Sequence, residues 1–228
     1  MFHSPPSRRT LWSALWPLLP VLALAACKSP SAQTEKAWTF TCPEPASRVA
    51  NDSGRVLTFT GADPADRNIC LAQGSAPVRL AWGMVEETNS EGRGHQAGMA
   101  SLFPSKTGGN ASYTATVSSP GSGIQYPYET RWRVVAFEKL EVPAGKFDAV
   151  VLERTVGGTG ANAAQTFTVR YWLDGISGIV LKRTVELGRG GSTLLGNLAA
   201  TEVTLPPPPP RAPPPQGAPS GPPPAGSS

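Results

Sequence analysis

Histidine is nearly absent from this sequence. Of the two histidines in 228 residues, His3 lies in a segment that we expect to be removed, which leaves only His95. One histidine cannot build the usual zinc sites, which draw on several His or Cys ligands. A Ser-His-Asp site would have to use His95, which stands between glycines in a stretch typical of an exposed loop, and no Gly-x-Ser-x-Gly string accompanies it. We therefore predict no catalytic residue, no metal and no cofactor.

Concentrated charge is also lacking. The formal net charge is +4, and residues 1–26 contribute Arg8 and Arg9 without any acid, so the chain after residue 26 carries +2. Proteins that bind nucleic acid usually gather their Lys and Arg into a basic patch, and no such run occurs here. We therefore expect no nucleic-acid partner.

The amino-terminal segment has the features of an export signal. Arg8 and Arg9 precede an apolar stretch over residues 11–26, which is short for a membrane-spanning helix of about 20 apolar residues and contains Pro17 and Pro20. The stretch closes in Leu24-Ala25-Ala26-Cys27, which resembles the lipobox of bacterial lipoproteins. That resemblance implies cleavage before Cys27 and attachment of lipid to its thiol.

These features divide the beginning of the chain. Residues 1–26 are predicted to be a lipoprotein signal peptide, and residues 27–36 a lipidated cysteine with a polar tether. The residue after the cysteine is Lys28, not the Asp of an inner-membrane retention signal, so we expect an anchor on the periplasmic side of the bacterial outer membrane. The competing interpretation is an ordinary secreted protein with a chance cysteine at the cleavage point.

Two cysteines remain once Cys27 is lipidated. Cys42 and Cys70 belong to an exported chain, in which disulfides persist, and they lack the Cys-x-x-Cys spacing of a redox pair. We predict a structural disulfide between them.

The carboxyl-terminal segment is rich in proline. Twelve of the chain's 25 prolines lie in residues 206–228, which otherwise consist almost entirely of Gly, Ala and Ser. Such a composition cannot bury an apolar face, and it favours a disordered tail of polyproline II character. The tail is either a passive end or a spacer that contacts peptidoglycan or an envelope protein.

The intervening residues, 37–205, are predicted to form one β-rich domain. Turn residues interrupt the chain every dozen residues or so, and period-2 alternation marks strand candidates. In residues 130–137, for example, Arg131 and Arg133 alternate with Trp132 and Val134. The further candidates are residues 56–60, 78–85, 112–117, 150–156, 166–172, 178–187 and 198–205, with a short helix near residues 96–103 ended by Pro104. We therefore predict an all-β, mainly antiparallel fold, a strongly curved sheet, half-barrel or sandwich with at most one or two short helices.

Several motifs in the second half of the chain resemble a family of bacterial envelope proteins. They are Phe-Pro-x-x-x-Gly at residues 103–108, Val-Pro-Ala-Gly-x-Phe-x-Ala at 142–149, and Tyr-Trp at 171–172 followed by Gly-x-Val at 178–180. The family is functionally uncharacterised and rich in antiparallel sheet, and some relatives are thought to resemble the curved half-barrel of lipoprotein carriers. The resemblance implies no catalytic residue. In physical terms Pro143 and Gly145 suit a tight corner between strands, and Gly178 suits a turn.

Two functions stay open from the sequence. One is a binding or carrier module whose curved sheet holds an apolar or lipid-like ligand, with Trp132, Phe147 and Trp172 as candidate lining residues. The other is a structural lipoprotein that contacts the cell wall or envelope proteins through its Pro-rich tail. An enzyme is disfavoured.

Overall fold

The fold is known from a computed structural model that describes residues 37–87, 95, 97–118, 125–159, 166–188, 193 and 195–207. All of these residues belong to one compact unit. The predicted signal peptide, the lipidation site at Cys27, the tether and nearly all of the Pro-rich tail lie outside the described residues.

In the described residues eleven antiparallel strands build a single sheet. The predicted all-β, mainly antiparallel fold is confirmed, and of the predicted architectures the structure has the single sheet. In chain order the elements are β1 (Arg48–Asn51), β2 (Val56–Asp63), β3 (Asp66–Gln73), β4 (Pro77–Ala81), β5 (Val85–Glu86), the 3-10 helix η1 (Ala100–Leu102), β6 (Asn110–Ser118), β7 (Gln125–Val142), β8 (Gly145–Gly158), β9 (Thr166–Asp174), β10 (Val180–Leu187) and β11 (Leu198–Thr204).

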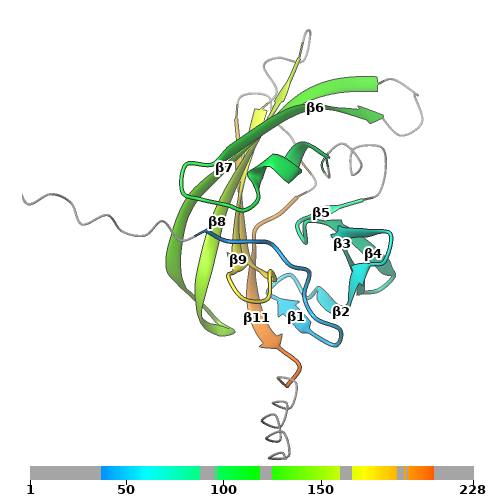
Figure 1. The fold of residues 1–228 in the computed structure, drawn as a ribbon, viewed down its shortest axis with the longest axis vertical. Helices are drawn as coiled ribbons and strands as arrows, with labels where there is room; N and C mark the ends of the chain where they lie inside the picture. The colour runs from blue at the N-terminus through cyan, green and yellow to red at the C-terminus, as the bar shows by residue number, and fades with distance from the viewer. Residues whose placement is uncertain are drawn as a thin grey trace, which may run out of the picture. The chain divides into compact units, whose positions relative to one another are not determined.

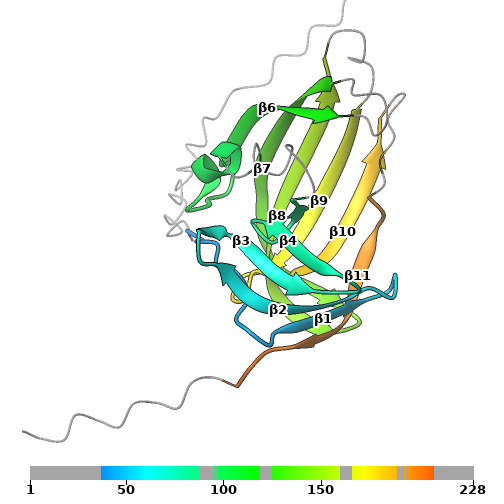
Figure 2. The ribbon, with the colours of Figure 1, turned by 90° about the vertical axis from the view of Figure 1, so that its right-hand side faces the viewer.

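The spatial order of the strands joins two meanders. It runs β5-β4-β3-β2-β1-β11-β10-β9-β8-β7-β6, so the early and late strands meet where β1 pairs with β11. Each meander is a series of antiparallel neighbours, and β5 and β6 are the edges of the sheet. Figure 1 shows the long strands β7 and β8 bending along their length, and Figure 2 shows β1–β4 standing in front of the lower part of β8–β10. The sheet is therefore strongly curved but does not close on itself.

Most predicted strands are confirmed, with one break. The candidate strand over residues 78–85 is divided into β4 and β5 by a tight turn, because Trp82 and Gly83 both adopt positive φ, +52° and +68°. β1 and β3 were not predicted. The expected helix is present as helical residues 97–99 followed by η1, and it ends before a cis Phe103–Pro104 bond.

The turns proposed from the family motifs also form. Pro143 and Ala144 make the corner between β7 and β8, with Gly145 at φ +136°. Gly178 lies in the β9–β10 connection at φ +70°, where a Cβ atom would collide with the carbonyl oxygen of Thr41. Only glycine fits there, because both the backbone conformation and the close approach exclude a side chain.

One continuous core holds the two meanders together. Side chains that are 3% exposed or less come from both of them, for example Phe59 and Ile69 on one side and Leu152 and Leu181 on the other. The start of the described chain is tied in by Trp38, which pairs with Ser105 through two backbone hydrogen bonds. Trp38 also belongs to a group of contacting aromatic rings, which are Trp38, Phe40, Trp82 and Phe103.

Candidate functional site

A cavity of about 460 Å³ lies between the two meanders. Its walls come from β1, β2, β4 and β5 on one side and from β8 to β11 on the other. Small-molecule sites are commonly of about 300–1,000 Å³ and mostly apolar, with few polar groups. The size and place of this cavity make it the candidate site.

Apolar side chains supply most of the wall. Phe59, Leu80, Met84 and Tyr171 are each at least 94% buried. The full apolar set is Val49, Leu57, Phe59, Leu80, Met84, Val85, Phe167, Tyr171, Val180, Leu195 and Leu198. A wall of this kind favours a ligand that leaves water for an apolar surface.

Strand register explains which residues of the long strands reach the cavity. Leu152 is opposite Tyr171, and Tyr171 is opposite Arg183, so these three share one face of the sheet. Because neighbouring strand residues point to opposite faces, Glu153 and Arg170 lie on the other face. We call the face that carries Leu152, Tyr171 and Arg183 the inner face. The face that carries Glu153 and Arg170 is the outer face.

Arg183 brings a cation into this apolar wall. Its Nε donates a hydrogen bond to the carbonyl oxygen of Gly196 at 2.9 Å, and no carboxylate among the described residues forms an ion pair with it. Burial lowers the pKa of Arg183, and the nearby charge of Arg55 lowers it further, while Tyr171 and Glu86 act in the opposite direction. Guanidinium groups stay protonated under all ordinary conditions, so the cavity contains a partly desolvated positive charge.

A second arginine stands at the cavity with a partner. Arg55 forms an ion pair with Glu86 at 2.5 Å, and both side chains are about 40% exposed. The pair links the β1–β2 connection to the edge strand β5. Exposed pairs of this kind contribute roughly 0–1 kcal/mol to stability, so it can open at small cost.

A buried polar network adjoins the cavity through Arg154, which is also one of the lining residues. Arg154 donates from an Nη to His95 Nε2 at 3.0 Å, and Trp132 Nε1 donates to the Tyr113 hydroxyl at 3.0 Å. His95 Nδ1 is also hydrogen-bonded to that hydroxyl. Because arginine has no acceptor, Nε2 must accept, and a neutral His95 then carries its proton on Nδ1.

The prediction that His95 lies in an exposed loop is wrong. Residue 95 is helical, and its side chain is fully buried. The helical segment approaches β6 closely at Gly98, where a Cβ atom would collide with the ring of Tyr113. The glycines around His95 suggested flexibility, whereas Gly98 serves close packing.

The three predicted lining residues do not come together. Trp132 lies on the inner face, opposite Arg154, and stacks on Tyr171 with ring centroids 5.7 Å apart. It therefore contacts two residues of the cavity wall without being part of the wall. Phe147 is seven residues from Arg154 along β8, and a separation by an odd number places it on the outer face.

Trp172 also lies on the outer face. It is opposite Val151, donates from Nε1 to Glu138 Oε1 at 2.7 Å, and has the Lys182 ammonium 4.8 Å from its ring centroid. This part of the outer face is buried, because Trp172 is 8% exposed and Ala149 and Val151 on the same face are 3% and 2% exposed. Trp172 therefore contributes to the packing of the fold and does not line the cavity.

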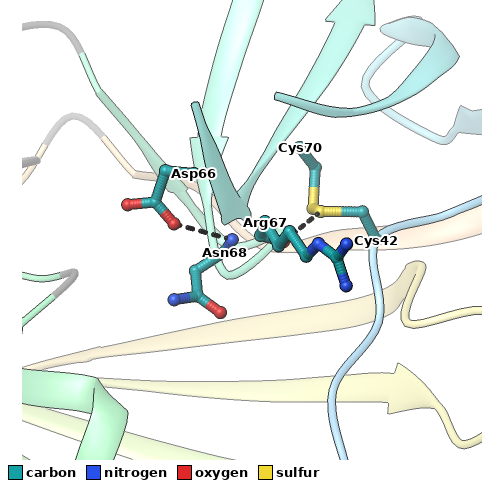
Figure 3. Close-up of a disulfide and its surroundings, with 5 residues drawn as sticks. All are labelled: Cys42, Asp66, Arg67, Asn68 and Cys70. Carbon is teal, nitrogen blue, oxygen red and sulfur yellow. Dashed lines mark hydrogen bonds between the residues drawn. A yellow bond between two sulfur atoms is a disulfide. The ribbon is translucent and has the colours of Figure 1, made fainter. Parts of the chain in front are cut away.

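The predicted disulfide is present in the structure. Cys42 and Cys70 are bonded, with Cα atoms 5.3 Å apart, and Cys70 is completely buried in β3 (Figure 3). The Cys42 sulfur lies 3.5 Å from the carbonyl oxygen of Arg67, and the Asp66 carboxylate accepts a hydrogen bond from the Asn68 backbone at 2.9 Å. The bond fixes the start of the domain to the meander that covers the inner face.

Sequence reasoning missed the arginines of the cavity. Arg154 interrupts the apolar run of β8, and Arg183 occupies an inward position of β10. The signal for Arg154 was available, because a lone cation amid inward-facing apolar residues is unusual. The position of Arg183 depends on pairing with Leu198 in β11, which alternation alone does not indicate.

Across the described part of the chain, no three His, Cys, Asp or Glu side chains gather as a metal ion would require. Within those same ranges, no helix is long and apolar enough to cross a membrane.

Comparison with known proteins assigns no function to the cavity. No family model matches the chain, and no curated protein matches it significantly. Among solved structures the chain is similar to the hypothetical lipoprotein YmcC from Escherichia coli, with 14% sequence identity and a TM-score of 0.42 over 73% of this chain and 89% of that one.

Proposed function

We propose that this chain is a lipid-anchored protein of the bacterial envelope that holds an apolar, lipid-like molecule in the cavity between its two meanders. The observation that carries the proposal is the cavity of about 460 Å³, of whose eighteen lining residues eleven are apolar. A volume of that size suits one slender apolar molecule rather than a protein segment. The proposed role is binding and not catalysis.

The membrane anchor is proposed from the sequence. Cleavage before Cys27 would leave eleven peptide units between the lipid and Trp38, which span at most about 40 Å when extended. Trp38 is held by Ser105 and donates from Nε1 to the Gly175 carbonyl oxygen at 3.0 Å. The cavity would thus stay close to the bilayer, and we place the protein on the periplasmic side of the outer membrane.

The non-enzymatic role is supported by the state of the single histidine left after cleavage. Tyr113 engages one ring nitrogen of His95 and Arg154 engages the other. A histidine whose two nitrogens are held in a buried network supports the packing of β6 against β7 and β8. It is poorly placed to act on a substrate.

Native mass spectrometry tests the binding role. The mature chain from residue 27, with Cys27→Ser, is purified from a periplasm and sprayed under non-denaturing conditions. We expect a fraction of molecules with an added lipid mass that leaves on mild activation. Protein that carries no added mass, even after incubation with an envelope lipid extract, would contradict the proposal.

A pair of leucine substitutions provides the matched control. Leu57→Trp adds volume inside the cavity, whereas Leu205→Trp makes the same change at a site that is 44% exposed and follows β11. We expect the first variant to lose the added mass and the second to keep it. Equal loss or equal retention in both variants would place the molecule elsewhere.

The alternative role, contact with peptidoglycan or an envelope protein through the Pro-rich tail, is separated by a deletion. β11 ends at Thr204, so a chain that stops after Pro207 retains the whole sheet. Under the binding proposal this deletion leaves the lipid mass unchanged. If, in the Cys27→Ser chain, the deletion abolishes envelope association while no added lipid mass is found, the interaction role is the correct one.

A further inference from the structure

The charges on the cavity wall are unbalanced. Of the residues that line it, three are cationic and one is anionic, which are Arg55, Arg154, Arg183 and Glu86. The formal balance is therefore +2, in a wall that is otherwise mostly apolar. A purely apolar ligand would gain nothing from such charge, which costs free energy to keep away from water.

Arg183 is the lining cation whose Nη groups no described residue engages. Its Nε is used by Gly196, but none of the residues described in the structure accepts a hydrogen bond from its two Nη groups. Its side chain projects from β10 between Tyr171 in β9 and Leu198 in β11, both of which line the cavity. A guanidinium presents its N–H groups as a fork that matches the two oxygens of a carboxylate or phosphate.

The other two arginines are engaged. Arg154 is 3% exposed, donates to His95 and lies over the Trp132 ring at 5.9 Å, so it belongs to the buried network. Arg55 is paired with Glu86 in the half-exposed ion pair at the cavity. Arg55 is near enough to Arg183 for its charge to lower the pKa of that residue.

We propose that the ligand is an anionic amphiphile, an acyl chain that ends in a carboxylate or a phosphate monoester, and that Arg183 receives its acid group. The acyl chain lies against the apolar wall, for example Phe59 and Val180. Arg55 adds a second positive charge to the same region. The inference rests on the proposed function and deepens it by naming the chemistry of the ligand.

Glu86 is the group that opposes this assignment. It is the one carboxylate among the residues that line the cavity, and its negative charge repels an incoming acid. Its ion pair with Arg55 is exposed and therefore weak, so the ligand acid can compete for Arg55. Removal of this charge in Glu86→Gln should strengthen the binding of anions, the opposite of the effect expected at Arg183.

Three probes that share one oleoyl chain test the proposal. Monoolein has a neutral head, oleate a carboxylate and oleoyl lysophosphatidate a phosphate. Each is titrated into the mature Cys27→Ser chain below its aggregation concentration, by displacement of a fluorescent apolar dye. Because a hydrogen bond to a charged group contributes more than one between neutral groups, we expect the anions to bind about tenfold tighter than monoolein.

Variants assign that preference to Arg183. We expect Arg183→Gln to reduce oleate and lysophosphatidate affinity about tenfold and to leave monoolein unchanged. Arg183→Lys keeps the charge and loses the forked donor geometry. Its affinity for the two anions should lie between that of the unsubstituted chain and that of Arg183→Gln. The matched control is Arg131→Gln, at an arginine that pairs with Glu129 on the outer face and should alter none of the three affinities. Whichever anion binds tighter identifies the source of the acid group.

The outcomes that overturn the inference differ from those that overturn the proposed function. Equal binding of monoolein and the anions by the unsubstituted chain, or an anion preference that survives Arg183→Gln, refutes the assigned head group and leaves a neutral lipid in the cavity. Failure of all three probes, monoolein included, refutes the binding role itself. The comparison of probes on the unsubstituted chain stays decisive if a variant fails to fold.

Discussion

Arginines on the two faces of the long strands differ in whether a carboxylate pairs with them. On the outer face, Arg133 and Arg170 flank Glu153 at 2.9 Å and 2.6 Å. The hydrogen bond from Arg170 lowers the pKa of Glu153, burial partly opposes this, and Arg133 lowers it further. On the inner face, Arg183 meets no carboxylate partner among the described residues, and burial lowers its own pKa.

The two sets of arginines therefore have different roles. The outer arginines Arg133 and Arg170 share the carboxylate of Glu153, so each has an anionic partner within the fold. The inner cation imposes a desolvation cost that its protein contacts do not fully offset. A charge kept under those conditions is expected where a ligand supplies the missing partner, which is the basis of the inference for Arg183.

The largest expected effect separates neighbouring residues of β7 that point to opposite faces. Trp132→Ala should lower the free energy of unfolding by about 3–5 kcal/mol, because it empties a site that is 1% exposed and removes the donor to Tyr113. Arg131→Ala, one residue earlier on the outer face, should change it by less than about 0.5 kcal/mol. Denaturant unfolding followed by circular dichroism measures both. Similar losses in the two variants would show that the faces do not differ in packing as described.

The next effect concerns the meander that covers the inner face. Replacement of Cys42 and Cys70 together by serine should lower the unfolding free energy by about 3–4 kcal/mol, because the bond closes a loop with a sequence separation of 28. The melting temperatures of the oxidised chain and the double variant give the difference. A double variant that melts with the oxidised chain would mean that the bond adds no constraint.

A smaller effect is expected on the outer face, and it depends on pH. Because the folded-state pKa of Glu153 lies below its ordinary value of 4.5, the charge stabilises the fold fully above that pH, and the contribution is lost as the pH falls through the lowered value. Glu153→Gln should therefore cost about 1 kcal/mol at pH 7 and less at pH 2. Unfolding curves at the two pH values check this. A cost that is the same at both would show that charge is not its cause.

The smallest effect has the opposite sign. Arg183→Met removes the desolvated cation and keeps an apolar side chain, so the ligand-free protein should be unchanged or more stable by up to about 1 kcal/mol. Thermal unfolding of delipidated protein measures it. A loss of 2 kcal/mol or more would mean that Arg183 is a structural residue and would remove the argument for an acid group in its ligand.

Local patterns predicted the strands better than the site. The alternation around Trp132 and the corner at Pro143 are properties of a few neighbouring residues, and both are confirmed. The inner and outer faces along β7 are not local, because a bulge between Val134 and Ala136 changes which residues point inward. Without that bulge, Trp132 and Leu140 would share a face, and Leu140 is opposite Phe147.

The cavity itself could not be predicted for a related reason. It exists because β1 pairs with β11 and brings β2 and β4 over β9 and β10, a contact between the two ends of the domain. Period-2 alternation identifies which residues are half-buried, but it does not identify what covers them. A lone arginine in an apolar strand was the one local sign of the polar groups inside.

A bromine-labelled fatty acid tests the central claim most directly. Crystals of the mature Cys27→Ser chain grown with dibromostearate would locate the acyl chain by anomalous scattering. We predict bromine peaks between β2 and β10, with the carboxylate density at the Nη atoms of Arg183. Peaks confined to the outer surface, with the cavity free of bromine at saturating ligand, would contradict the account.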